Sequence, residues 1–225
     1  MQGNSINAAG DFIVRKFKKA AARCFDEREE ETTFNDGFFY IQEKNKFINI
    51  MDLADKAEQL GMQYILETEL ENVVEGKSYP YDAHFSEVEI DPETGSTKCV
   101  KYTVVDDFGL LINPMLAEGQ VHGGVAQGIG QALTEHVVFD DYGQLLSGTL
   151  MDYGLPRADT IPSITFDTQL IPSTSNKIGM KGCGEAGTVG ALAAIANATL
   201  DAVCQMGVIQ VDMPFTPNRI WSYIN

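Results

Sequence analysis

The stretch KGCGEAG at residues 181–187 combines three glycines with a carboxylate. Gly182, Gly184 and Gly187 have the G-x-G-x-x-G spacing of a dinucleotide-binding turn. Such a turn binds a pyrophosphate at the start of a helix, where backbone N–H groups attract anions. Glu185 already places a negative charge inside the turn, so the stretch reads better as a glycine loop that presents a glutamate.

The residues around this loop also disfavour dinucleotide binding. A Rossmann turn directly follows a buried strand and opens a βαβ unit, but the strand expected upstream ends at Ile171 and only 38 residues (225 minus 187) follow Gly187. A buried helix is predicted over residues 188–206, and a glutamate at its start is stabilised by the helix dipole by about 0.3–1 kcal/mol. Glu185 is then either a helix cap or a general base. The apolar anchors expected for this helix are Val189, Leu192, Ile195, Leu200 and Val203.

A second glycine-rich segment begins at Pro114, which suits the first turn of a helix, and continues to Glu135. It contains glycines at 119, 123, 124, 128 and 130, and each costs up to about 1 kcal/mol relative to alanine in a helix. Two explanations remain open. The helix packs closely against another backbone, or its start lies against a cofactor, with Gln127 offering a side-chain amide.

The elements that must position these residues follow from apolar periodicity and turn residues. We expect an α+β fold in two lobes, 1–76 and 77–225, with mixed or antiparallel sheets packed against helices. In the first lobe the pattern predicts helices over 11–25 and 51–60, a hairpin turning at Asn35-Asp36-Gly37, and a strand over 64–74. In the second it predicts strands over 83–90 and 98–105 joined by the turn DPETG, and a strand over 164–171.

Composition limits the function classes. The chain has 16 basic and 32 acidic residues, for a net charge of −16, and such a surface repels nucleic acid and anionic membranes. No apolar run is expected to reach the roughly 18 residues needed to cross a bilayer. The acidic run DEREEE at 26–31 is typical of a solvated helix end or turn. We expect a cytoplasmic protein.

The cysteines and histidines suggest no metal site by spacing. Cys24, Cys99, Cys183 and Cys204 form no C-x-x-C pair, and His84, His122 and His136 are far apart in the chain. The cysteines are expected to be reduced thiols. Each histidine is expected to be a packing or surface residue.

Four ordered phrases resemble the molybdopterin-binding large subunit of the xanthine oxidase, aldehyde oxidase and carbon monoxide dehydrogenase family. They are SYPYDAHFSEVEIDPETG (78–95), EGQVHGGVAQGIGQALTE (118–135), MDYGLPRA (151–158) and KGCGEAG (181–187). The chain looks like the C-terminal half of that subunit. The resemblance implies an enzyme that oxidises an aldehyde, an N-heterocycle or carbon monoxide with oxygen derived from water.

The resemblance also implies roles for individual residues. Glu185 corresponds to the family's catalytic base beside molybdenum, and the amide of Gln127 to the one that hydrogen-bonds a molybdenum oxo ligand. The cofactor would be molybdopterin cytosine dinucleotide, whose dithiolene holds the metal. The remaining cofactor contacts would come from a loop at Gly3-Asn4-Ser5 and from the backbone around Lys181, Gly182 and Cys183. Cys183 itself is expected to pack rather than to bind metal.

The expected partners include the first half of such a subunit, which this chain lacks. They are that N-terminal half, a flavin (FAD) subunit and a subunit with two 2Fe–2S clusters, in a complex that is itself a dimer. The isolated chain is expected to be inactive, whether it is a domain of a longer subunit or a split subunit. A non-catalytic or assembly module that kept the fold is the alternative function.

Overall fold

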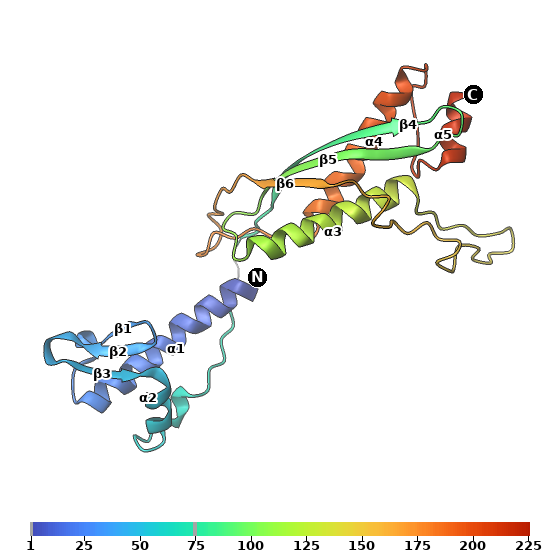
Figure 1. Ribbon diagram of the computed structural model, residues 1–225. Coiled ribbons are helices and arrows are strands. Elements are labelled where there is room, and N and C mark those ends of the chain that lie inside the picture. The colour runs from blue at the N-terminus through green and yellow to red at the C-terminus, as the bar shows by residue number, and fades with distance from the viewer. Residues whose placement is uncertain (1, 74–75) are drawn as a thin grey trace. The chain divides into compact units, whose positions relative to one another are not determined.

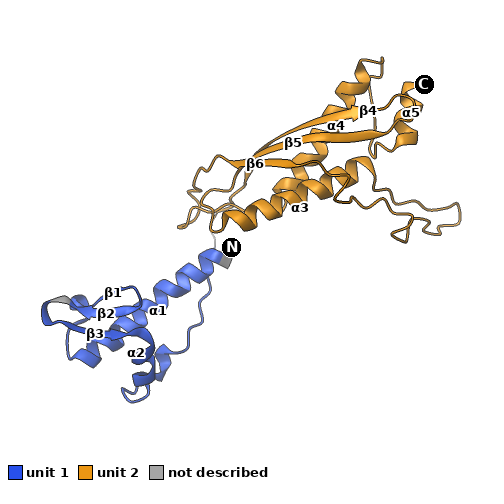
Figure 2. Ribbon diagram, in the orientation of Figure 1, with its two compact units in different colours: residues 1–75 blue, residues 76–225 orange. Residues whose placement is uncertain are grey.

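The computed structural model describes residues 2–73 and 76–225, which form two compact units (Figures 1 and 2). Unit 1 covers residues 1–75 and unit 2 residues 76–225, so the division lies one residue before the boundary expected from the sequence. Both units combine helices with a three-stranded sheet. The α+β class is confirmed.

Unit 1 packs two helices against a small antiparallel sheet. Its core joins Phe17, Ala20 and Ala21 of the first helix to Phe39 and Ile48 of the sheet. The regular elements are α1 (Gln2–Phe25), β1 (Thr33–Asn35), β2 (Phe38–Ile41), β3 (Lys46–Asn49) and α2 (Ile50–Ala57), with short 3₁₀ turns at Glu29–Glu31, Gln42–Lys44 and Gln63–Ile65.

The predicted hairpin turn is present between β1 and β2. Asp36 and Gly37 both have positive φ, at 46° and 78°, as a two-residue type I′ turn requires. The turn pairs Asn35 with Phe38 and Phe34 with Phe39. Phe39 is thereby placed in the core.

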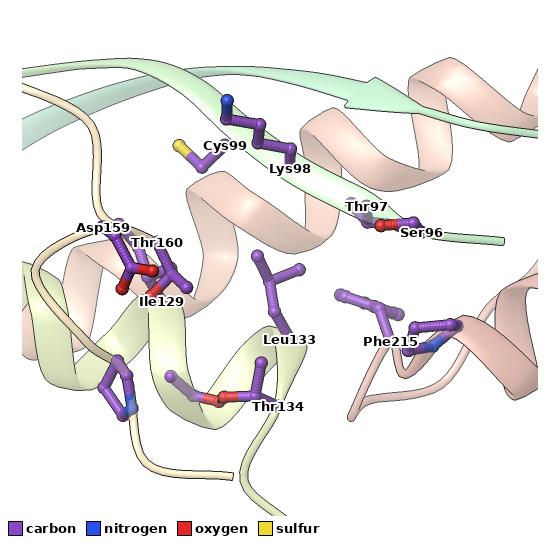
Figure 3. A pocket seen from close by; sticks show the side chains of 13 residues that line it. Ser96, Thr97, Lys98, Cys99, Ile129, Leu133, Thr134, Asp159, Thr160 and Phe215 are labelled. Carbon is purple, nitrogen blue, oxygen red and sulfur yellow. The ribbon is translucent and has the colours of Figure 1, made fainter. Parts of the chain in front are cut away.

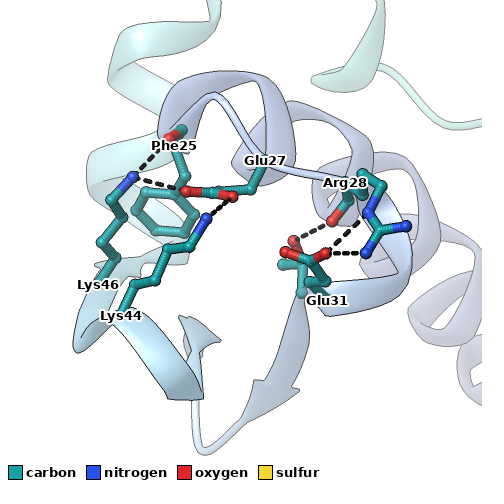
Figure 4. Close-up of polar contacts among 7 residues, drawn as sticks. Phe25, Glu27, Arg28, Glu31, Lys44 and Lys46 are labelled. Atoms are coloured by element: carbon teal, nitrogen blue, oxygen red, sulfur yellow. Dashed lines mark hydrogen bonds and ion pairs between the residues drawn. The ribbon is translucent and has the colours of Figure 1, made fainter.

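The acidic run after α1 forms local ion pairs at the surface of unit 1 (Figure 4). Glu27 bonds Lys44 and lies 2.9 Å from the ammonium of Lys46, while Arg28 bonds Glu31. The hydrogen bonds from Lys44 and Lys46 hold the pKa of Glu27 below its usual value. The run is therefore the solvated turn that its composition predicts.

Two expectations for unit 1 were wrong. α1 begins at Gln2 rather than near residue 11, so Asn4 and Ser5 lie in its first turns and not in a loop. No residue among 2–10 is a proline, and the two glycines, Gly3 and Gly10, do not break the helix. The strand expected over 64–74 is also absent: residues 63–65 form a 3₁₀ turn and the described residues 66–73 are irregular, while Val74 lies outside the described residues.

Unit 2 is a mixed sheet with two long helices (Figure 1). Strands β4 (Tyr81–Ile90) and β5 (Thr97–Asp107) form the antiparallel ribbon, and β6 (Ile164–Thr168) adds parallel to β5. The helices are α3 (Pro114–Leu133), α4 (Ala186–Cys204) and the short α5 (Pro217–Ile224). The mixed sheet and the absence of a strand directly before α4 rule out a Rossmann unit.

Helix α4 covers one face of the ribbon. The hydroxyl of Ser86 on β4 donates to the carbonyl of Ala194 at 2.8 Å. The residues of α4 that lose all contact with solvent are spaced by four: Ala191, Ile195, Thr199 and Val203. Val189 was expected among the anchors, but it is 65% exposed because it lies off this stripe.

Helices α3 and α4 touch through glycines. A Cβ at Gly124 would lie 3.0 Å from the Cα of Gly187, and one at Gly187 would lie 2.5 Å from the carbonyl oxygen of Val121. A Cβ at Gly128 would lie 2.5 Å from the Cβ of Ala191. Close packing therefore explains these glycines.

Gly128→Ala should lower the free energy of unfolding of the 225-residue chain by about 1–3 kcal/mol, because the added methyl group overpacks the contact between α3 and α4. Gly123→Ala, in the same helix but with nothing within 4 Å of its Cβ position, should raise it by up to about 1 kcal/mol. Urea unfolding of both variants measures the difference. Equal effects would contradict the packing assignment.

By length and hydropathy α4 could span a membrane, contrary to the expectation that no segment approaches this limit. The same helix supplies Ala191, Ile195 and Val203 to the core of unit 2. Its apolar composition is accounted for by that packing.

Candidate cofactor-binding site

One face of α3 is exposed and carries two glycines and two glutamines. Gly119, Gly123 and Gln127 are spaced by four and lie on the same side of the helix. Gln120 lies at the edge of this face, where its amide donates to the carbonyl of Gly184 at 2.8 Å. The face of α3 and the KGCGEAG loop therefore form one surface.

A buried ion pair anchors the start of that loop. The ammonium of Lys181 lies 2.5 Å from the carboxylate of Asp107, and each side chain is 8% exposed. The ammonium also lies 4.9 Å from the centre of the Tyr81 ring. The backbone N–H of Lys181 donates to the carbonyl of Phe108 at 2.8 Å. Lys181 therefore serves the site by fixing its backbone, since its charge is already paired.

Asp107 is ionised in this arrangement. Burial works to raise its pKa, but the hydrogen bonds from Lys181 and from the backbone N–H groups of Ile171 and Gly109 hold the pKa below its ordinary value. Three donors to one carboxylate fix its orientation. Because Ile171 and Gly109 belong to different segments, Asp107 ties both to the loop.

Glu185 occupies the N-cap position of α4, with φ −119° and ψ −5°. Its side chain makes no capping hydrogen bond and is exposed. Among the described residues, no group accepts a hydrogen bond from the N–H of Gly182, Cys183 or Gly184. The carboxylate and these donors are therefore available to a molecule outside this unit.

Thr188 links the two helices beside Glu185. Its hydroxyl donates to the carbonyl of Gly124 at 3.1 Å and lies 3.5 Å from the side-chain oxygen of Gln127. Gln127 is exposed and has no shorter hydrogen bond among the described residues. The amide of Gln127 is therefore near the first turn of the helix that begins after Glu185.

The remaining glycines fit a bulky group that approaches from outside. A Cβ built at Gly119, Gly123, Gly182 or Gly184 meets no atom within 4 Å, and none of the four has positive φ. Neither packing nor backbone conformation within this unit requires glycine there. A cofactor that lies against the backbone would require it, so the residues present fit such a group.

The structure brings together only some of the predicted site residues. Gln127, Lys181, Gly182, Cys183 and Glu185 share this surface of unit 2. Cys183 is half-buried against the core and its thiol is free, in line with a packing role. Asn4 and Ser5 belong to α1 of unit 1.

Sequence reasoning missed three residues of the site. Gln120 could have been found, because it lies seven positions before Gln127 and so shares its side of the helix. Asp107 gave no local signal, since its partner Lys181 is 74 positions away. Thr188 looked like an ordinary helix residue.

A separate cavity of about 300 Å³ lies elsewhere in unit 2 (Figure 3). It is lined by the last turns of α3 around Ile129 and Leu133, by the start of β5, and by Asp159 and Phe215. None of the candidate site residues lines it. The cavity is therefore no part of the candidate site.

Comparison with known proteins gives this surface a context. The family described as "Molybdopterin cofactor-binding domain" matches residues 1–162. The carbon monoxide dehydrogenase large chain of Hydrogenophaga pseudoflava is 34% identical over 97% of this chain, which covers 28% of the relative. The nicotine 6-hydroxylase large subunit of Paenarthrobacter nicotinovorans is 33% identical over 97%, again covering 28%.

Solved structures agree. The crystal structure of the Cu,Mo-CO dehydrogenase in its carbon monoxide reduced state matches 99% of this chain with a TM-score of 0.85 and 30% identity, over 29% of that chain. Quinoline 2-oxidoreductase from Pseudomonas putida 86 matches 98% with a TM-score of 0.80 and 30% identity. The chain thus spans less than a third of the length of these relatives, so it is a smaller part of the subunit than the half expected from the sequence. It belongs to the molybdopterin-binding large-subunit family of the molybdenum hydroxylases, which includes the carbon monoxide and xanthine dehydrogenases.

Proposed function

We propose that this chain is the part of a molybdenum hydroxylase that holds molybdopterin cytosine dinucleotide and presents Glu185 as the general base. The observation that carries the proposal is the open surface around Gln127 and Glu185, where four glycines clear the backbone without a reason inside unit 2. Its substrate would be an aldehyde, an N-heterocycle or carbon monoxide. The relatives are named for different substrates, carbon monoxide, nicotine and quinoline among them, and so do not select one.

Each residue of the surface has a role in this proposal. When bound, the pterin-held molybdenum supplies the two-electron redox chemistry and acts as a Lewis acid. The carboxylate of Glu185 would accept a proton, and the side-chain amide of Gln127 would donate a hydrogen bond to the bound cofactor. The unpaired N–H groups of Gly182, Cys183 and Gly184 suit the polar or anionic parts of the cofactor.

The neighbouring positions support the base rather than the cap role for Glu185. A capping glutamate would bond the first N–H groups of its helix, and Glu185 does not. An exposed carboxylate beside a surface that accommodates a cofactor is placed to accept a proton.

The remaining parts of the proposed enzyme lie outside unit 2. Asn4 and Ser5 would contribute to the dinucleotide contacts from α1. The rest of the large subunit, a flavin subunit and an iron–sulfur subunit would complete a cytoplasmic complex that dimerises. The relatives are themselves named as a large chain or as a large subunit, which suits an assembly of this kind.

The cofactor surface can be tested apart from the chemistry. Gly123→Leu in the complete enzyme should lower the molybdenum content by on the order of tenfold, the effect of about 1.4 kcal/mol lost in binding, because its side chain would occupy the open face of α3. The isolated chain should keep its stability, since nothing lies within 4 Å of that position. Metal analysis of the purified complex and urea unfolding of the chain are the two measurements.

A matched control is Glu118→Leu, because Glu118 is an exposed residue of the same helix and lies five positions before Gly123, on a different side of α3. It should leave the molybdenum content unchanged. Full molybdenum content in the Gly123→Leu enzyme would place the cofactor elsewhere and overturn the proposal.

A further inference from the structure

Three potential metal ligands meet on the face of the ribbon that α4 covers. Asp82 and His84 lie two residues apart on β4, so their side chains point to the same side of the sheet. Asp106 on β5 is the direct cross-strand partner of Asp82. One ligand atom from each of the three side chains lies within 4.8 Å of the other two.

The buried members of this cluster carry polar atoms that have no hydrogen-bond partner. Asp106 is 1% exposed, and neither of its carboxylate oxygens is bonded. The Nε2 atom of His84 is buried and also unbonded, 3.9 Å from the carboxylate of Asp82. Buried polar atoms are almost always paired, so unpaired atoms on two buried side chains of one cluster indicate a bound species.

The charge of the cluster favours a cation as that species. Among the described residues, no lysine or arginine forms an ion pair with Asp82 or Asp106. A divalent cation would both contact the unpaired atoms and balance the charge of the carboxylates, whereas a water molecule would satisfy only the hydrogen bonds.

The imidazole of His84 is held in a ligand orientation. Its Nδ1 lies 2.7 Å from the buried hydroxyl of Tyr102, and with the proton on Nδ1 the lone pair of Nε2 faces the carboxylates. A hydrogen bond from the second ring nitrogen is what orients histidine ligands in metal sites. Gly190 of α4 makes room for the ring, because a Cβ there would lie 2.3 Å from it.

We propose that Asp82, His84 and Asp106 bind one divalent transition-metal ion, with Zn²⁺ as the probe that tests it. One imidazole and two carboxylates are a ligand set that zinc accepts, with water as the fourth ligand. Metal–ligand bonds of about 2.0–2.2 Å bring tetrahedral donor atoms to about 3.3–3.6 Å from one another. The ligand atoms therefore need to approach one another by roughly 1 Å from the 4.8 Å within which they now lie.

This site is separate from the proposed molybdenum surface and does not depend on it. The ion would join β4 to β5 directly beneath the first turns of α4, where Gly190 contacts His84. Its role there would be to fix the ribbon under the helix that begins after Glu185. Loss of the ion would loosen this contact without removing any residue of the cofactor surface.

The test uses the 225-residue chain, stripped with a chelator and titrated with Zn²⁺. We expect one ion per chain by metal analysis and calorimetry, and a rise in the melting temperature when zinc is present. Co²⁺ in place of Zn²⁺ should give visible bands without a sulfur charge-transfer band, which separates this site from the four free thiols. Asp106→Asn and His84→Asn should each weaken binding by at least about tenfold.

His136→Asn is the matched control, since His136 is exposed and outside the cluster. It should bind Zn²⁺ like the unaltered chain. Circular dichroism shows whether the variants fold, and Asp106→Asn is the safer of the two because it removes a buried charge. A folded Asp106→Asn chain that binds zinc normally, or an unaltered chain that binds none outside its thiols, would overturn the proposal in favour of a bound water.

Discussion

Replacing Glu185 by glutamine in the complete enzyme is expected to lower turnover by about 10²–10⁴-fold, the usual contribution of a positioned general base. The substitution keeps the shape of the side chain but removes its ability to take up a proton. Glu185 makes no capping hydrogen bond, so the helix should keep its start. Molybdenum content should therefore stay unchanged, and steady-state kinetics with metal analysis measure both.

Glu93→Gln is the matched control for this experiment. Glu93 is an exposed residue of the turn between β4 and β5, and its replacement should leave turnover as it was. Normal turnover in the Glu185→Gln enzyme would instead favour a non-catalytic module that kept the fold. A parallel loss of molybdenum and turnover would make Glu185 a cofactor-retaining residue rather than the base.

Lys181→Met is expected to lower the free energy of unfolding of the chain by about 3–5 kcal/mol, because it leaves the buried carboxylate of Asp107 without its countercharge. Both side chains are 8% exposed, so water cannot replace the lost ammonium. The Tyr81 ring loses its cation as well. Urea unfolding followed by circular dichroism gives the value.

Lys101→Met supplies the comparison, because Lys101 pairs with Glu87 at a surface where its side chain is 62% exposed. Exposed pairs contribute about 0–1 kcal/mol, so this variant should unfold almost like the original chain. Combining Lys181→Met with Asp107→Asn should recover part of the loss, since the unpaired charge is then gone. Equal effects of Lys181→Met and Lys101→Met would show that Asp107 is solvated.

Local signals were enough to predict the elements that carry the site. Pro114 marks the first residue of α3. Asp36-Gly37 marks the turn between β1 and β2, and DPETG the turn between β4 and β5. Glu185 could be singled out because its charge conflicts with the glycine spacing around it. These features depend on neighbours within a few residues, where propensity and turn chemistry act.

The features that the sequence did not predict depend on contacts between distant segments. Asp107 and Lys181 are 74 positions apart, and no sequence pattern near either residue indicates that the other is its partner. His84 was expected to pack, but its two aspartate neighbours became visible only with the register of β4 and β5. Val189 fits an apolar helix pattern, yet α3 and the sheet cover a different side of α4 and leave Val189 exposed. Tertiary packing decides such cases.

The glycine contact between α3 and α4 also has a mechanical consequence. Where two helices meet through backbone atoms, no side chain lies between them that could change its rotamer and take up a displacement. Gln127 and the residues at the start of α4 therefore move as one stiff body. Any adjustment to molecules of different size must come from more compliant segments. The side chains of Gln127 and Glu185 keep their spacing while that adjustment occurs.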